Sequence, residues 1–227
     1  MSKSYRLELL IRHSNETALA ARRDFKTQME AVRKSFAFLD YHFRTLESEP
    51  KSLFRNVKMV LTTRFTNHLF STLLLCERGL ILDAFNCSRS GIETTAFYWL
   101  VCLDPNSAVL YEQERSPPPV EVRKRLEALG VDVNEIRQLY SFESGIAHVG
   151  NKYDNLQIRW EEGANGKLMV GGGSNPPVQC SMLEAMPSAI ARFIRHDEKY
   201  IVTIEKDRFV IGDENDDSEA IRDPRRD

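Results

Sequence analysis

The residues best placed to do chemistry are Arg89 and Glu93, which lie four positions apart in an otherwise apolar segment. At roughly 100° per residue they share one helix face with Asn86. A guanidinium binds carboxylates and phosphates, and the two side chains can also pair with each other. Leaving both ions in a dry core costs several kcal/mol for each. We therefore expect this polar stripe to face a cleft, a polar network or a second subunit, unless the pair only fixes the helix register.

Two histidines are further candidates. His68 follows Arg64 by one helical turn, and such a pair can titrate near neutral pH and hold an anion, or can simply pack. His148 is expected near a helix C-terminus, whose dipole stabilises a protonated imidazole, with Asn151 one turn further on; it can bind a ligand or cap the helix. The candidate catalytic residues are Arg89, Glu93, His148, Arg64 and His68. The candidate ligand-binding residues are Asn86, Arg89, Glu93, His148 and Asn151.

Other catalytic and metal-binding patterns are missing from the sequence. It has no G-x-S-x-G, no H-E-x-x-H and no paired Glu-x-x-His motif. The glycine-rich stretch "GGGSNPP" lacks the Gly-Lys-Ser/Thr of a phosphate-binding loop. No C-x-x-C pair occurs, so we expect reduced, packed thiols and neither a metal site nor a cofactor. The four cysteines are Cys76, Cys87, Cys102 and Cys180.

Charge and hydropathy indicate a soluble, cytoplasmic protein. The chain carries 31 lysines and arginines against 33 aspartates and glutamates, which gives no global sign of a nucleic-acid or membrane partner. The N-terminal residues lack the apolar stretch of a secretory signal. The two most apolar windows, 57–76 and 80–103, contain charged residues and are not simple membrane spans. The basic clusters around Arg22 and Arg123 are typical of solvated helix faces.

A long first helix is predicted from Ser14 or Asn15 to Glu47. Its apolar residues alternate at spacings of four and three, which forms a seam over three heptads. Such a seam packs against a partner helix, which is either an antiparallel neighbour in the same chain or a second subunit. The seam consists of Phe25, Met29, Val32, Phe36, Leu39, Phe43 and Leu46.

The stripe lies in one arm of a predicted central αα-hairpin. Helices over 52–78 and 80–103 are apolar on almost all sides and are joined at Gly79, so they belong in the middle of a bundle. A short helix should follow and end at Gly130, and another should run from about 132 to Gly150. A last helix is expected over 181–206, with Pro187 as a kink or as its true start.

A β-hairpin is predicted near residues 155–172. Leu156, Ile158 and Trp160 alternate with polar residues, an Asn-Gly turn follows, and the alternation resumes at Leu168. A lone hairpin is barely stable in water, so it should lie on the bundle. The predicted fold is therefore mainly α: a single helical-bundle domain over 1–212, built on the central αα-hairpin, with one β-hairpin appended. Residues 213–227 form a charged tail that we expect to be disordered.

The order of these elements, with "SRSGIE" in the central hairpin and "SGIAHVGN" ending a later helix, resembles uncharacterised helical families similar to the HEPN (higher eukaryotes and prokaryotes nucleotide-binding) superfamily. The resemblance spans residues 25–200. It implies a homodimer and a role in prokaryotic defence or toxin–antitoxin systems. Active HEPN members are metal-independent ribonucleases with an arginine and a histidine separated by four to six residues in one helix.

This chain departs from that pattern, because Arg64 and His68 are separated by only three residues, as are Arg192 and His196. His148 has no arginine at the required distance. In a HEPN-like enzyme the histidine would be the general acid or base for attack by the 2′-hydroxyl, and the arginine would stabilise the phosphorane. Two hypotheses follow. The protein is a homodimeric binding module for a protein, RNA or small anionic ligand, or it is a metal-independent endoribonuclease.

Overall fold

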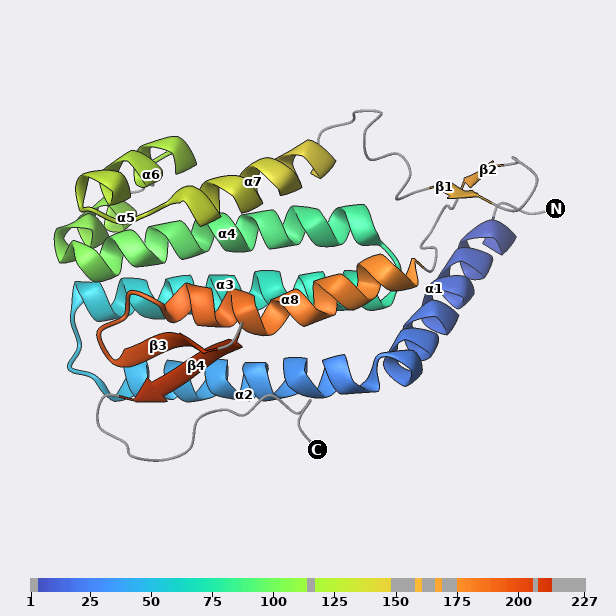
Figure 1. The fold of residues 1–227 in the computed structure, drawn as a ribbon, viewed down its shortest axis with the longest axis horizontal. Helices are drawn as coiled ribbons and strands as arrows, with labels where there is room; N and C mark the ends of the chain where they lie inside the picture. Colours follow the sequence, from blue (N-terminus) through green and yellow to red (C-terminus); the bar gives the residue numbers. More distant parts are fainter. Residues whose placement is uncertain are drawn as a thin grey trace.

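The computed structural model describes residues 4–113, 117–147, 158–160, 166–168, 175–205 and 208–213. These residues form a mainly α-helical bundle, as predicted (Figure 1). The helices are α1 (Ser4–Asp24), α2 (Lys26–Ser48), α3 (Leu53–Glu77), α4 (Ile81–Leu103), α5 (Ala108–Glu112), α6 (Pro119–Ala128), α7 (Asn134–Ala147) and α8 (Pro176–Ile194), with a 3₁₀ turn, η1, at Pro105–Ser107. The strands are β1 (Ile158–Trp160), β2 (Gly166–Leu168), β3 (Tyr200–Glu205) and β4 (Arg208–Asp213).

The central αα-hairpin, α3 and α4, has the predicted ends. The side chain of Ser52 caps α3 by accepting from the backbone N–H of Arg55. Gly79, with φ 73°, lies in the left-handed region after α3. Its N–H donates to the carbonyl of Cys76, and the N–H of Leu80 donates to that of Leu75. This Schellman motif satisfies the last carbonyls of α3 and turns the chain directly into α4.

The other long helices cover the two sides of this hairpin. Helices α2 and α8 pack against α3 and against each other, whereas α6 and α7 pack on α4 (Figure 1). The seam of α2 is covered within the chain, with Val32, Leu39 and Leu46 buried. Trp99 of α4 is fully buried, and its indole N–H donates to the carbonyl of Arg192 in α8. The core therefore surrounds α3 and α4, between the α2–α8 layer on one side and α6 and α7 on the other.

The predicted first helix differs from the structure in two ways. It begins at Ser4, and it is interrupted at Phe25, whose φ of −112° and ψ of 39° separate α1 from α2. Figure 1 shows that α1 consequently leaves the bundle at an angle to α2. In its C-terminal half Thr17, Ala18 and Ala21 are buried, while Leu7 is exposed. The break lets the seam of α2 follow the bundle while only one end of α1 touches it.

The predicted last helix was wrong at both ends. It begins at Pro176, where Asn175 caps it by accepting from the N–H of Val178, and Pro187 lies inside it. It ends at Ile194. The β-branched run after Tyr200 forms β3, which pairs antiparallel with β4 from Tyr200↔Asp213 to Glu205↔Arg208. Isoleucine, valine and threonine favour a strand over a helix here.

Within the segment for which a hairpin was predicted, β1 and β2 pair antiparallel from Ile158↔Leu168 to Trp160↔Gly166. The remaining residues of 155–172 lie outside the described ranges, so a β-hairpin appended to the bundle stays a prediction. The tail after Asp213 also lies outside them. In the described ranges, no helix combines the length and apolarity that a membrane span requires.

Candidate functional site

The predicted stripe on α4 is partly exposed. The Nε of Arg89 lies 3.4 Å from Oε1 of Glu93, and the two side chains are 26% and 33% exposed. Asn86 is exposed, one turn earlier on the same helix. The ion pair is thus neither sealed in the core nor fully solvated. Both side chains lie where a ligand could reach them.

Tyr140 of α7 holds Arg89 from one side. The Nη2 of Arg89 donates to the Tyr140 hydroxyl at 2.8 Å, and the guanidinium carbon lies 4.8 Å from the ring centroid. Arg123 of α6 lies 4.9 Å from the same centroid. Two cations on one aromatic ring join α4, α6 and α7 at this point. The position of Arg89 is therefore fixed by contacts from outside its own helix.

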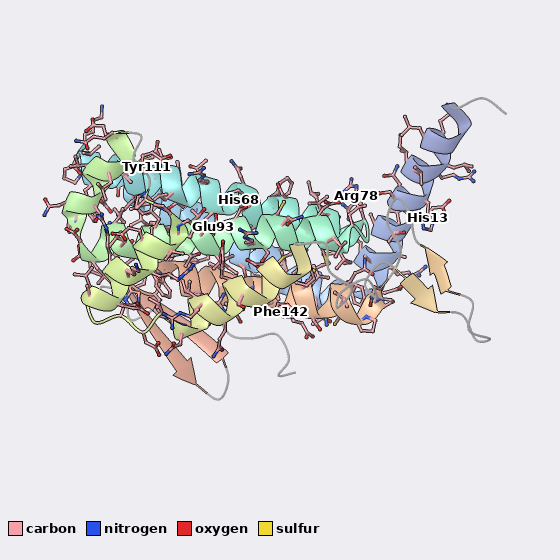
Figure 2. All side chains as sticks on the ribbon, turned by 90° about the horizontal axis from the view of Figure 1, so that it is seen from above. His13, His68, Arg78, Glu93, Tyr111 and Phe142 are labelled. Carbon is pink, nitrogen blue, oxygen red and sulfur yellow. The ribbon has the colours of Figure 1, made fainter. Side chains whose placement is uncertain are left out.

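His68 of α3 lies on the other side of the stripe. Figure 2 shows His68 and Glu93 next to each other on the face seen from above. Helices α3 and α4 run close together here, since a Cβ on Gly91 of α4 would lie 3.8 Å from the Cβ of His68, an ordinary van der Waals contact. Burial lowers the pKa of His68, the charge of Arg64 lowers it further, and Glu93 opposes both. A neutral imidazole therefore faces the stripe at physiological pH.

The remaining predicted site residues are placed differently. Arg64 is exposed and lines a groove on the outer side of α3; its charge acts on His68 one turn further along the helix, but it forms no hydrogen bond or ion pair with Arg89 or Glu93. His148 and Asn151 lie outside the described residues, and their predicted roles stay predictions. The structure therefore brings Arg89, Glu93 and His68 together and adds Tyr140 to them.

Glu143 of α7 is a buried carboxylate that the sequence reasoning missed. It is only 6% exposed, and its Oε1 accepts from the hydroxyl of Ser88 at 2.7 Å. Burial raises the pKa of Glu143 to about 7, against the opposing effects of the Ser88 hydrogen bond and of Arg192 and Arg89. Its Oε2 has no hydrogen-bond partner among the described residues. The spacing from the buried Ile136, two turns earlier, could have indicated this inward position.

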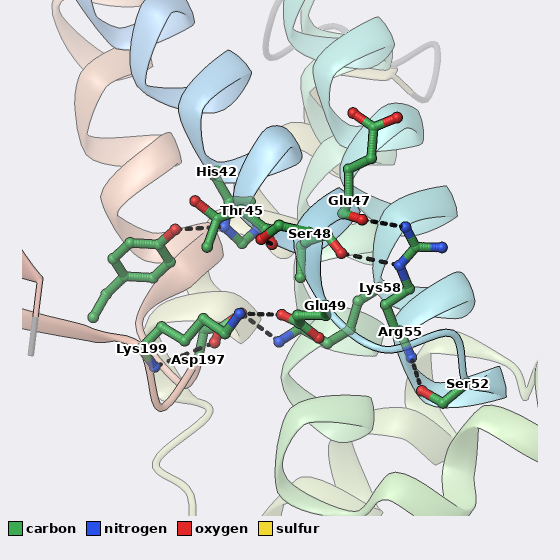
Figure 3. A network of polar contacts seen from close by, with 12 residues as sticks. His42, Thr45, Glu47, Ser48, Glu49, Ser52, Arg55, Lys58, Asp197 and Lys199 are labelled. Atoms are coloured by element: carbon green, nitrogen blue, oxygen red, sulfur yellow. Dashed lines mark hydrogen bonds and ion pairs between the residues drawn. The ribbon is translucent and has the colours of Figure 1, made fainter. Parts of the chain in front are cut away.

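A second polar cluster, also missed, is buried among α2, α3, α4 and the segment after α8 (Figure 3). The Nζ of Lys58 lies 2.7 Å from Oδ2 of Asp197, and these side chains are 3% and 0% exposed. The Tyr98 hydroxyl donates to the same oxygen. His42 lies between two phenols, with Nε2 3.0 Å from the Tyr98 oxygen and Nδ1 3.0 Å from that of Tyr200.

The hydrogen bonds of this cluster run in one direction. Because Tyr98 gives its hydroxyl hydrogen to Asp197, it must accept from Nε2–H of His42, which leaves Nδ1 to accept from Tyr200. Burial lowers the pKa of His42 to about 4; Asp197 opposes this change, while Lys58 and Lys199 add to it. Burial raises the pKa of Asp197, but the charge and hydrogen bonds of Lys58 and Tyr98 outweigh it and the pKa is lowered.

The two clusters have different chemical capacities. The His42–Tyr98–Asp197–Lys58 cluster is closed to solvent and joins helices, so its role is structural. The α4 stripe is open, and Arg89 has further N–H groups beyond the ones that bind Glu93 and Tyr140. No three histidine, cysteine or acidic side chains of the described ranges converge as metal ligands would.

No protein-family model, curated protein sequence or solved structure matches the chain. The HEPN resemblance therefore stays a prediction from the sequence. The chemistry open to the α4 stripe follows from its own contacts.

Proposed function

We propose that this protein is a helical binding module whose α4 stripe recognises a partner or a small anionic ligand. One observation carries the proposal: the Arg89–Glu93 ion pair is about a quarter to a third exposed and is held in place by Tyr140. Held rigidly at the surface, the guanidinium can bind a carboxylate or phosphate at little cost in side-chain entropy. His68, neutral and adjacent, adds one donor or acceptor.

A cytoplasmic homodimer acting in prokaryotic defence or in a toxin–antitoxin system is the biological setting that the HEPN resemblance implies. The proposal of a binding module does not depend on that setting. It depends on the stripe being open and on Arg89 having donors left to offer.

The test is identification by mass spectrometry of what copurifies with the chain, compared between the native protein and Arg89→Gln. The matched control is Arg125→Gln, because Arg125 also forms an i,i+4 ion pair with a glutamate, Glu121, on an exposed helix face. We expect a nucleotide, RNA or protein that is retained by the native chain and the control and lost from Arg89→Gln. Equal retention by all three proteins would rule out the stripe as the binding site.

The second candidate is a metal-independent ribonuclease, favoured by the neutral His68 beside Glu93 and Arg89. A neutral imidazole can accept a proton from a 2′-hydroxyl, and a guanidinium can stabilise a phosphorane. Incubation of the purified protein with RNA in EDTA separates the two functions. Cleavage that disappears in His68→Ala and in Arg89→Ala would favour the enzyme. An absence of cleavage, or cleavage that neither variant affects, would exclude it.

A further inference from the structure

The outer side of α3 carries a groove that is separate from the α4 stripe. It has a volume of about 550 Å³ and lies between α2 and α3, with α5 at one edge. Pockets of several hundred Å³ are the usual size for small-molecule sites. The groove is shallow and open to solvent, so a ligand of modest size would lie along it with one side exposed.

One end of the groove is apolar. Phe43 of α2 and Met59 and Val60 of α3 line it, and Val60 is 44% exposed. An aliphatic side chain so exposed next to two other apolar side chains gains stability when it is covered. This end is suited to the hydrocarbon part of a ligand.

The other end of the groove is polar. Arg64 and Asn67 follow Val60 along α3, so at about 1.5 Å per residue they lie roughly 6 and 10 Å further along the helix axis. Thr63, between the two ends, uses its hydroxyl hydrogen on the carbonyl of Met59 and has only acceptor capacity left. Tyr111 of α5 adds a hydroxyl to the lining.

The donors at the polar end are unused. Arg64 and the side chain of Asn67 form no hydrogen bond or ion pair with the residues that the structure describes. Arg55, on the same helix, differs, because its guanidinium donates to the carbonyls of Leu46 and Glu47. Arg64 is thus a cation at one end of an apolar groove, and no carboxylate of the described ranges is bound to it.

We propose that this groove binds a small amphiphilic carboxylate. Its carboxylate group pairs with the Arg64 guanidinium and accepts from the Asn67 amide, and its apolar body lies along Phe43, Met59 and Val60. A guanidinium fork matches one carboxylate, and the single positive charge of Arg64 balances a carboxylate fully but a phosphate dianion only in part. The inference is independent of the function proposed for the α4 stripe.

The test uses octanoate as the probe, with 1-octanol as the neutral ligand of similar length and acetate as the anion without an apolar body. Met59 is one of six methionines, so methyl-labelled methionine gives a signal in the groove that can be assigned with Met59→Leu. We expect octanoate to shift the Met59 methyl resonance saturably. Octanol and acetate should each bind at least about tenfold more weakly, because each lacks one of the two interactions.

Arg64→Gln should weaken octanoate binding at least about tenfold and leave octanol binding unchanged. Val60→Asn should weaken both. Arg12→Gln, which removes an exposed arginine of α1, should change neither. The proposal is overturned if octanol binds as tightly as octanoate, if Arg64→Gln keeps the native affinity for octanoate, or if the Met59 resonance does not move.

Discussion

Lys58 and Asp197 form a fully buried ion pair that attaches the turn after α8 to the central helix α3, with Nζ and Oδ2 2.7 Å apart. The Tyr98 hydroxyl donates to the same carboxylate, so the aspartate has two donors on one oxygen. A buried pair of this kind contributes little net stability compared with a well-packed apolar pair. It is costly to break, because the remaining buried charge has no counter-ion.

Lys58→Met should therefore lower the free energy of unfolding by about 3–5 kcal/mol, and Asp197→Leu by a similar amount. The double variant should be less destabilised than the sum of the two, because it leaves no unpaired ion. Urea unfolding followed by circular dichroism measures all three. Single variants that each cost less than about 1 kcal/mol would show that the charges are not desolvated as described.

Glu93→Gln should cost less than about 1 kcal/mol, because its pair with Arg89 is partly exposed and solvent-screened. The same urea titration checks this, with Glu121→Gln as the matched surface ion pair. A small cost makes variants of the α4 stripe suitable for binding experiments without loss of the fold. A cost as large as that of Lys58→Met would instead make the pair a structural element.

Glu143→Gln should stabilise the protein at pH 8. The pKa of this carboxyl is about 7 in the folded protein and near 4.5 in the unfolded chain. Between these values the folded protein holds a proton that the unfolded chain has released, so stability falls as the pH rises through this window. The loss of stability across the whole window amounts to about 3 kcal/mol. The gain should be present at pH 8 and absent at pH 4 in urea titrations, and a gain that is independent of pH would contradict the assignment.

His42 should give the opposite pH dependence. Its pKa is about 4 when folded and near 6.5 when unfolded, so the unfolded chain binds the extra proton and stability falls as the pH drops from 6.5 to 4. The loss is about 3 kcal/mol. In the native protein Glu143 offsets much of this loss, so the slope should be clearest in Glu143→Gln. Adding His42→Gln to that variant should remove the slope; a slope that persists would assign it to other groups.

Gly79→Ala should destabilise the central hairpin by about 1–2 kcal/mol, because alanine in the left-handed region is strained. Gly130 is the matched position, because its φ is 81° and no described atom lies within 4 Å of the place that a Cβ would take there. The same substitution at Gly130 should cost a similar amount. Thermal unfolding compares the two. A much larger cost at Gly79 would indicate that side-chain crowding adds to the backbone strain.

The parts of the fold that follow from local signals could be predicted, and those that follow from distant contacts could not. Ser52 and Gly79 mark the ends of α3, and the sequence shows both. Nothing local marks the break at Phe25, because no glycine or proline precedes Pro50 in the sequence. The apolar spacing also continues beyond Ile194, but the helix ends there and the chain turns to bring Asp197 against Lys58. That contact joins residues far apart in the sequence.

In the candidate site too, features that follow from local sequence signals could be predicted, whereas contacts between distant residues could not. The helical angle between successive residues was enough to place Arg89 and Glu93 on one face of α4. The cost of burying two ions indicated that this face would contact solvent or other polar groups. Tyr140 could not be identified as the partner of Arg89, because the contact depends on how α7 packs on α4. Lys58 and Glu143 belong to no sequence motif that would single them out. Their spacing from buried neighbours such as Leu61 and Ile136 placed them on the inner faces.

The one-way hydrogen bonds from Tyr200 through His42 and Tyr98 to Asp197 have a consequence for motion. They join β3, α2, α4 and the turn after α8 through shared protons, so no one of these segments can separate without leaving a buried group unsatisfied in another. This end of the bundle should therefore open as one cooperative unit, with its backbone amides exchanging with solvent at a common rate. Helix α1, which touches the bundle at only one end, is free to fray on its own.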